Sequence, residues 1–289
     1  MTLRWVPGWN GLTEPEAVSY VAAVEAADGQ ELEFGVAKAI NDFVLGCKND
    51  GIWDAIKASC ILAGARTLSG ALVPLVGAAP TNYNFVAGDY DRETGLVGDG
   101  STKYLDSNRN NNADPQDSHH MGGYSTITSG FPETIMGAGA AATGSTQLGR
   151  SSISPGNMVF RSRSGSESGS VAFGIGLNAM SRSNSTQVQI KSGSNSATAS
   201  STSQTSFNGN VLVFGRADGS NIPGAFSSAR LAFYSIGEAL DLAALDTRVT
   251  RLMNLITYTQ TAGLPDLSTM DMDAAAYIGG AYRAGGTLS

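Results

Sequence analysis

Between about residue 80 and residue 237, short stretches of β-branched and aromatic residues alternate with turns rich in Gly, Asn and Ser. The stretches are residues 84–86, 103–105, 121–127, 134–136, 158–160, 171–173, 188–190, 211–214 and 231–234. Many short strands at this spacing predict an antiparallel sandwich or jelly roll. No helical pattern separates the strands, which disfavours a parallel α/β sheet.

The Ser-rich stretch at 151–210 is predicted to be part of this sandwich. Its composition alone is typical of a disordered linker, but apolar residues recur within it at strand spacing. They are Val159, Phe160, Val171, Phe173, Ile175, Val188 and Ile190. Disordered segments are poor in such residues, so we expect strands here.

Helical patterns flank the strand-rich region on both sides. Residues 14 to about 62 carry apolar stripes of helical spacing, with Asp28-Gly29 ending a first helix and Ile52, Trp53 and Ile56 starting a last one. After residue 237, an apolar stripe at Leu242, Leu245, Val249, Leu252 and Ile256 predicts an amphipathic helix, and Asp241 is its expected N-cap.

These patterns divide the chain into four predicted parts. They are an extended docking arm at 1–13, a helical platform at 14–79, a jelly roll with its closing helix at 80–258, and a C-terminal tail with a short helix at 259–289. Both tails carry aromatic or apolar residues that lack a core of their own: Trp5, Trp9, Tyr277 and Ile278. Because buried aromatics contribute strongly to interfaces, we expect these four residues to contact a neighbouring subunit or another protein of the same assembly; folding back on the sandwich is the alternative.

The charge balance and the apolar pattern exclude several partners. The formal net charge is -7 and the 18 basic residues are scattered, so we expect no nucleic-acid partner. No apolar run is long enough for a signal peptide or a membrane span, so we expect no membrane partner. Cys47 and Cys60 lie in apolar helical patterns and are expected to be buried free thiols, with a disulfide between them as the alternative.

Several segments together resemble a module of phage tail and fibre proteins. They are residues 53–58 (WDAIKA), 72–75 (LVPL), 80–82 (PTN), 88–90 (GDY), 94–96 (TGL), 98–105 (GDGSTKYL) and 230–240 (RLAFYSIGEAL). The sandwich of that module is similar to the concanavalin A-like, or laminin G-like, jelly roll. The resemblance covers roughly residues 14–258, and such a fold hosts lectins, glycanases and scaffolds alike.

The resemblance implies a non-enzymatic structural protein of a bacteriophage particle, in a tail, fibre, baseplate or capsid decoration. Its expected partners are other virion proteins, further copies of itself (as in a trimer), and a host surface glycan bound by the outward-facing sandwich. Its expected location is the virion, after assembly in the host cytoplasm. The alternative is a phage glycan depolymerase that cleaves by hydrolysis or elimination.

The pattern of titratable residues favours no catalytic site. Glycoside hydrolysis needs two facing carboxyl groups, and the sequence has no alternating Glu-x-Asp-x-Glu strand. Residues 89–93 alternate correctly but are flanked by turn residues, and Glu133, Glu167 and Glu238 are isolated and expected to be solvated or in turns. The only histidines, His119 and His120, are adjacent and are interpreted as a loop pair before a strand.

Metal and sugar binding remain as hypotheses. Acidic residues on loops are weak candidates for Ca²⁺: Asp89, Asp91, Asp99, Asp114 and Asp117, with Asp106 nearby. Asp also dominates ordinary turns, so we expect no cofactor and no essential metal. Sugar binding needs a shallow polar surface with an exposed aromatic, for which Tyr83, Tyr90, Tyr104, Tyr124 and Phe131 are candidates.

Overall fold

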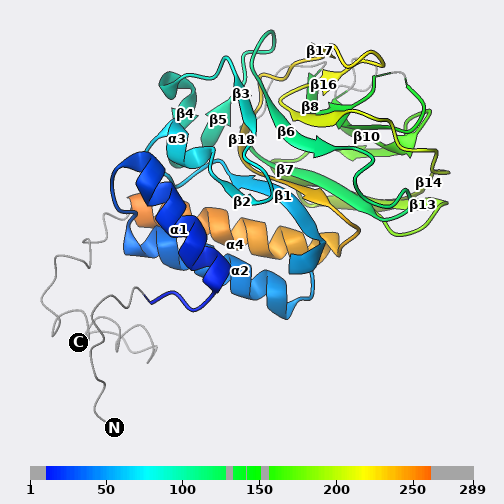
Figure 1. Cartoon of the computed structure of the whole chain (residues 1–289). Helices are drawn as coiled ribbons and strands as arrows, with labels where there is room; N and C mark the ends of the chain where they lie inside the picture. The colour runs from blue at the N-terminus through cyan, green and yellow to red at the C-terminus, as the bar shows by residue number, and fades with distance from the viewer. Residues whose placement is uncertain (1–10, 128–132, 141, 151–155, 262–289) are drawn as a thin grey trace, which may run out of the picture.

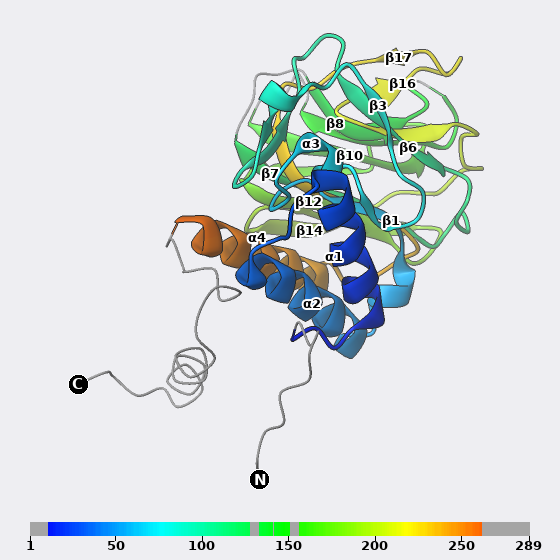
Figure 2. The same cartoon turned by 60° about the vertical axis from the view of Figure 1, so that its left-hand side comes forward.

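The computed structural model describes residues 11–127, 133–140, 142–150 and 156–261, and these form three layers (Figure 1). One layer consists of helices, the second is a nine-stranded antiparallel sheet (sheet A), and the third is a seven-stranded antiparallel sheet (sheet B). The helices cover the face of sheet A that points away from sheet B, as the turned view shows (Figure 2). The predicted mainly β fold with flanking helices is therefore confirmed.

Three long helices form the helical layer. They are α1 (Pro15–Asp28), α2 (Phe34–Asn49) and α4 (Leu242–Thr261). A short α3 (Leu68–Ala71) and two 3-10 turns, η1 (Trp53–Ala55) and η2 (Ala87–Asp89), lie in connections. The predicted end of α1 is confirmed, because Gly29 adopts the left-handed conformation (φ 67°) in which glycine meets no Cβ penalty.

Helix α4 closes the fold as predicted. Asp241 caps its N-terminus, since one carboxylate oxygen accepts hydrogen bonds from the amides of Ala243 and Ala244 at 2.8 and 3.3 Å. The side chains of Val249 and Leu252 are buried between α2 and sheet A. An ion pair between Arg248 and Asp50 at 2.6 Å joins α4 to the end of α2.

Sheet A has the strand order β14-β13-β12-β7-β18-β1-β2, with β5 pairing on β18 and β4 on β5. Its strands are β1 (Ile56–Ile61), β2 (Pro74–Val76), β4 (Tyr90–Asp91), β5 (Gly95–Val97), β7 (His119–Ile127), β12 (Gly176–Arg182), β13 (Gln187–Ser192), β14 (Asn195–Ser200) and β18 (Arg230–Gly237). Both of its faces are covered, one by the helices and the other by sheet B.

Sheet B has the order β11-β10-β9-β8-β15-β6-β3. Its strands are β3 (Thr81–Tyr83), β6 (Tyr104–Asn110), β8 (Glu133–Ala138), β9 (Ser145–Arg150), β10 (Asn157–Ser164), β11 (Gly169–Ala172) and β15 (Asn210–Val213). A small hairpin of β16 (Arg216–Ala217) and β17 (Pro223–Gly224) lies beyond it (Figure 1). The Ser-rich segment contributes β10 to β14, so the prediction of strands there is confirmed.

Two apolar cores hold the layers together. The helical core joins α1, α2 and α4 to Ile61, Leu177 and Phe233 of sheet A. The sandwich core lies between the sheets and includes Leu105 and Phe160 of sheet B. Since neighbouring residues of a strand point to opposite faces, sheet A supplies side chains to both cores.

The N-terminal region contains more sheet than its helical pattern predicts. The predicted helix starting at Ile52, Trp53 and Ile56 is wrong, because only the turn η1 forms there and β1 follows directly. Strand β1 pairs with β18 inside sheet A. Cys60 therefore lies in a strand rather than in a helix, whereas Cys47 lies in α2.

Both cysteines are buried free thiols, which confirms the prediction. Burial raises the pKa of each thiol to about 12. A thiol with so high a pKa stays protonated at neutral pH and reacts slowly.

Most of the outermost strands of the two sheets are short. Those of sheet A are β14, β2 and the two-residue β4, and those of sheet B are β11 and β3. Strand β2 has three residues and begins with Pro74, β3 also has three, and β11 has four. The six residues of β14 (NSATAS) include no large apolar side chain.

Candidate functional site

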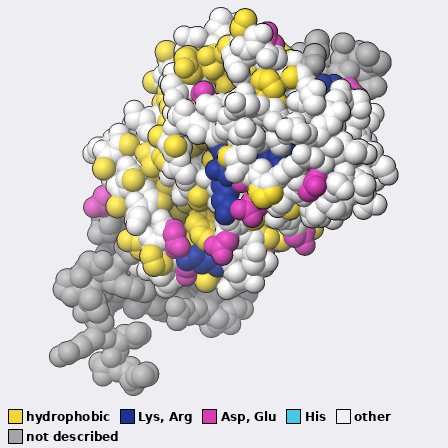
Figure 3. Space-filling model, turned by 45° about the vertical axis from the view of Figure 1, so that its right-hand side comes forward, with side chains coloured by type: hydrophobic (Ala, Val, Ile, Leu, Met, Phe, Trp, Pro, Cys, Tyr) yellow, Lys and Arg dark blue, Asp and Glu magenta, His cyan; other side chains and the backbone are white. Residues whose placement is uncertain are grey.

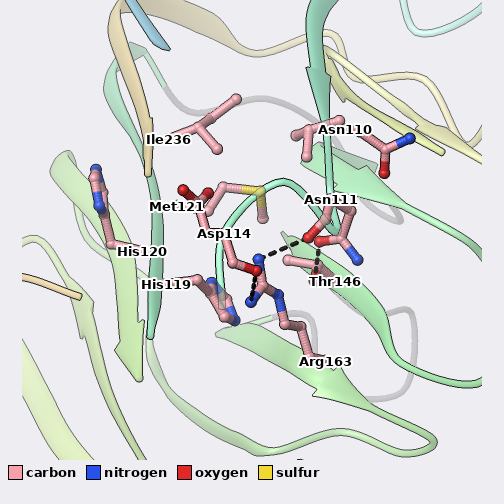
Figure 4. A pocket seen from close by; sticks show the side chains of 10 residues that line it. Asn110, Asn111, Asp114, His119, His120, Met121, Thr146, Arg163 and Ile236 are labelled. Carbon is pink, nitrogen blue, oxygen red and sulfur yellow. Dashed lines mark hydrogen bonds between the residues drawn. The ribbon is translucent and has the colours of Figure 1, made fainter. Parts of the chain in front are cut away.

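At one end of the sandwich the space between the sheets is lined by polar side chains (Figure 4). His119 of β7 and Ser162 of β10 meet there, with His119 Nε2 and Ser162 Oγ 2.9 Å apart. Ser162 Oγ also accepts a hydrogen bond from Arg182 Nε at 3.1 Å. The Ser162 hydroxyl has two acceptor lone pairs and one proton, so it can accept from Arg182 and either donate to or accept from His119 Nε2, depending on the tautomer of the imidazole. Burial, followed by the charges of Arg163 and Arg182, lowers the pKa of His119 well below its usual value.

Arg163 fixes the loop that follows β6. Its guanidinium donates to the backbone oxygens of Asn111 at 2.6 Å and of Asp114 at 3.1 Å, and also to that of Pro115. Arg163 itself has a left-handed backbone (φ 49°) where the pairing of β10 with β9 shifts register. This cluster therefore holds the loop at 110–118 against the sandwich.

A serine beside a histidine is also the arrangement of a nucleophile with its base, but this pair cannot meet a substrate. Ser162 is fully buried and His119 is 3% exposed. The cavity beside them has a volume of about 10 Å³. That volume holds no more than about one water molecule. The cluster is therefore a structural network rather than a reaction site.

The two histidines lie on opposite faces of sheet A. They are the first residues of β7, so the interpretation as a loop pair is wrong. His120 points into the helical side, where its Nδ1 donates to the backbone oxygen of Glu238 at 2.6 Å and its Nε2 accepts from the Ser235 hydroxyl at 2.7 Å. Burial lowers the pKa of His120 to about 4.

The outer face of sheet B, the side away from sheet A, carries an exposed aromatic pair. Tyr83 of β3 and Tyr104 of β6 are directly opposite and stack with their ring centroids 4.4 Å apart and an interplanar angle of 7°. Leu105, next to Tyr104, points into the sandwich core, so both tyrosines point outward. Tyr83 is 40% exposed, and Phe226 extends the pair with its centroid 5.7 Å from that of Tyr104.

Polar side chains lie on the same face beside this pair. Asp106 accepts two hydrogen bonds from the Asn210 side-chain amide at 3.0 and 3.2 Å. The Asn108 amide donates to Thr81 Oγ1 at 3.0 Å. This half of sheet B thus presents a tyrosine ring next to planar amide and carboxylate groups, which are the groups that sugars contact in proteins.

The pairing register continues the face across the sheet. Thr81 and Asp106 belong to one row with Leu212, Gly137, Gln147 and Arg161. This row crosses the strands β3, β6, β15, β8, β9 and β10. We refer to this row together with Tyr83, Tyr104, Asn108, Asn210 and Arg216 as the outer face.

Of the five aromatic candidates, the structure brings two together on this face. Tyr90 instead donates its hydroxyl proton to the backbone oxygen of Ala65 at 2.8 Å, and Tyr124 packs on the helical core. Phe131 lies outside the described residues, as do the predicted interface residues Trp5, Trp9, Tyr277 and Ile278.

The acidic loop residues are bound by the protein itself. Asp99 caps its own turn through the amides of Ser101, Thr102 and Lys103. Although desolvation raises it, these bonds and the Thr102 hydroxyl hold the pKa of Asp99 well below its usual range. Asp91 caps the preceding turn in the same way, because its carboxylate accepts hydrogen bonds from the backbone amides of Glu93 and Thr94.

The remaining candidates have basic or hydroxyl partners. Asp89 pairs with Lys103 at 2.6 Å, Asp114 pairs with Arg109, and Asp117 accepts from the Ser203 hydroxyl. Within the described ranges, no three His, Cys, Asp or Glu side chains gather as a metal site requires.

We expect chelation to leave the stability unchanged. Every candidate carboxylate either accepts a hydrogen bond from the protein or forms an ion pair with one of its basic side chains. Removing divalent metal should therefore expose no uncompensated charge. Thermal unfolding after prolonged dialysis against EDTA should give a melting temperature within about 1 °C of the untreated protein. A loss of several degrees that Ca²⁺ restores would show that an ion is bound.

One predicted solvated acid is buried. Glu133 is 5% exposed in β8 and accepts from the Ser227 hydroxyl at 2.6 Å, so the expectation that it is solvated is wrong. Glu167 is exposed, as expected. Sequence reasoning also missed Arg161 and Arg216, which are 55 positions apart in the printed sequence and carry no local motif.

No protein-family model matches this chain, and no curated protein matches it either. Within the described residues, no helix has both the length and the apolar character of a membrane span. A role for the chain must therefore be argued from the geometry of the outer face and from the sequence.

Proposed function

We propose that this chain is a non-enzymatic structural protein of a bacteriophage particle, and that its outer face binds a host surface glycan. The observation that carries the binding role is the stacked pair of Tyr83 and Tyr104 beside Asp106, Asn108 and Asn210. An exposed ring offers its apolar face to the C–H groups of a sugar, while neighbouring amides and carboxylates orient the hydroxyl groups.

The placement of the chain ends supports a particle role. The described chain begins at residue 11 and ends at residue 261, both at the helical layer (Figure 1). The outer face lies at the opposite side, beyond sheet A and sheet B. In our proposal the tails attach the helical layer to virion proteins or to further copies of this chain, and the outer face then points away from the particle. Mass spectrometry of purified particles tests this location.

The proposal also includes an assignment of the fold. We assign the two packed antiparallel sheets to the concanavalin A-like jelly roll that the sequence resembles. The division into a helical platform at 14–79 and a jelly roll at 80–258 stays a prediction. Strands β1 and β2 belong to the first of these segments but pair within sheet A.

Binding without cleavage is favoured by the composition of the outer face. Its row holds one carboxylate, Asp106, and both oxygens of Asp106 accept from Asn210. Glycoside hydrolysis uses two carboxyl groups on either side of the scissile bond. The proposal is therefore a lectin-like protein rather than a glycoside hydrolase.

Replacing Tyr83 by Ala is expected to weaken glycan binding by about tenfold, because one sugar–ring contact is worth about 1.4 kcal/mol. The measurement is binding of the purified protein to an array of bacterial surface polysaccharides, followed by biolayer interferometry on the strongest ligand. Phe34→Ala is the matched control, since Phe34 is 41% exposed but lies on α2 in the helical layer.

Two outcomes would contradict the proposal. Equal binding by Tyr83→Ala and the unchanged protein would place the sugar elsewhere. Release of reducing ends from a bound polysaccharide would show a depolymerase instead.

A further inference from the structure

Two arginines lie together on the half of the outer face farther from the tyrosine pair. Arg161 belongs to β10, at the end of the row that crosses sheet B. Arg216 belongs to β16 and lies across Gly137 of the same row, where a Cβ atom would stand 2.6 Å from the Thr146 backbone oxygen and 3.2 Å from Arg216 Cδ. A glycine at this position thus suits both the close strand and the side chain of Arg216, which lies next to Gln147.

Neither guanidinium is neutralised by the protein. Arg161 Nη1 donates to Ser145 Oγ at 3.3 Å, and Arg216 Nη1 donates to the side-chain oxygen of Gln147. The Nε atoms of both arginines are buried and have no hydrogen-bond partner within the described part of the chain. No ion pair to a carboxylate is formed by either residue within those ranges.

This arrangement costs electrostatic energy as it stands. Burial, followed by the nearby charge of Arg161, lowers the pKa of Arg216. Some arginines are paired with carboxylates, such as Arg92 with Glu33 at 2.7 Å and Arg248 with Asp50 at 2.6 Å. Others, such as Arg163 and Arg182, donate to several backbone and hydroxyl oxygens instead. In a chain with a net charge of -7, two neighbouring arginines without a carboxylate are a local excess of positive charge.

We infer that the glycan bound by the outer face is acidic, and that Arg161 and Arg216 bind its anionic groups. This inference rests on the proposed glycan-binding role and names the class of sugar. Guanidinium groups bind carboxylate and sulfate oxygens through parallel hydrogen bonds. Both arginines are half-buried, so an oxyanion at the accessible ends of their side chains offsets the repulsion between the two charges.

The length of the site indicates a polysaccharide rather than a single sugar. From β3 to β10 the row crosses five strand spacings, or about 24 Å at ~4.8 Å each. The tyrosine pair lies at one end of this distance and Arg161 at the other. A linear chain with repeating acidic groups can contact both ends at once.

The test compares three probes on one set of variants. The probes are a polygalacturonate oligosaccharide, which carries carboxylates, dextran sulfate, which carries sulfate esters, and neutral dextran. The variants are Arg161→Gln and Arg216→Gln. Arg251→Gln is the matched control, because it removes one positive charge from a side chain that is 61% exposed on α4, in the helical layer.

We expect the unchanged protein to bind an acidic probe, and each of Arg161→Gln and Arg216→Gln to weaken that binding by about tenfold or more. Arg251→Gln should change it less than about twofold. The melting temperatures of the two outer-face variants should stay equal to that of the unchanged protein or rise, because one of two repelling charges is gone. Which acidic probe responds shows whether the group is a carboxylate or a sulfate.

The inference and the function on which it rests fail in different ways. A protein that binds neutral glycans through Tyr83 and is indifferent to both arginine variants would overturn the acidic specificity alone. Absence of binding to all three probes and to the polysaccharide array would overturn the glycan-binding role as well. Equal weakening by Arg251→Gln would show that the protein responds to net charge and not to these two side chains.

Discussion

Val249→Asp or Leu252→Asp should lower the free energy of unfolding by about 4 kcal/mol or more, and the melting temperature by about 10 °C or more. Val249 is fully buried and Leu252 is 1% exposed, between α2 and sheet A. A carboxylate at either position would be buried without a partner. The helix cannot turn it toward water, because Leu245 and Ile256 hold the same face against the sheet.

The measurement is thermal and urea unfolding followed by circular dichroism. Asn254→Asp is the control, since Asn254 is exposed on the opposite side of α4 and the change adds the same charge. The control should change the melting temperature by about 2 °C or less. If the melting temperature of Val249→Asp equals that of the Asn254→Asp control, α4 does not close the fold in solution.

Acidification from pH 7 to pH 5 should also destabilise the protein, by about 2 kcal/mol or more. His119 and His120 both have folded-state pKa values below the value of about 6.5 in the unfolded chain. Between those values the unfolded state binds protons that the folded state does not. The stability that the two histidines contribute is therefore complete above pH 6.5 and is lost as the pH falls; the pKa of His120, about 4, makes its own loss about 2 kcal/mol by pH 5, and His119 adds to it in the same direction.

Urea unfolding at pH 7, 6 and 5 measures this loss. In His120→Asn the amide can still donate to the Glu238 oxygen, but the residue no longer titrates. We expect the loss between pH 7 and pH 5 to be smaller by about 2 kcal/mol in this variant. A stability that does not change over this interval would mean that the histidines are accessible to protons in the folded protein.

The sequence predicts the elements that have one covered face. Helix α4 buries Leu245, Val249 and Leu252 on one side only, so its apolar spacing and its cap at Asp241 are visible in the sequence. The sandwich was likewise visible from strand spacing. Both predictions follow from local patterns that the fold does not override.

Strand β1 is predicted wrongly because Ile52, Trp53 and Ile56 have helical spacing, and burial on both faces removes the alternation that would indicate a strand. In Ile56–Ile61, five of six residues are buried, so no alternation distinguishes this strand from a buried helix. His119 and His120 are buried for the same reason, one under sheet B and the other under the helical layer. No pattern within one segment shows that a third layer exists.

The outer face could be predicted only in part. Tyr83 and Tyr104 were recognised as aromatic candidates, but their stacking depends on the register between β3 and β6. Arg161 and Arg216 come together because the hairpin of β16 and β17 lies beyond sheet B, and Gly137 makes room for one of them. The residues of such a site are brought together by the strand order and the pairing register, which no short sequence motif indicates.

The short terminal strands bear on how densely copies of this protein can be packed. A strand at the end of a sheet exposes backbone groups that can pair with another chain and start aggregation. Here β2, β3 and β11 offer at most four residues each, Pro74 removes one donor, and β14 offers no large apolar side chain. Sheets from adjacent copies therefore find little to extend, and crowding many copies together should not drive them into amyloid-like assemblies. Where copies of the chain do meet, side chains rather than strand edges would make the contact, and side chains can be selective where backbone pairing is not.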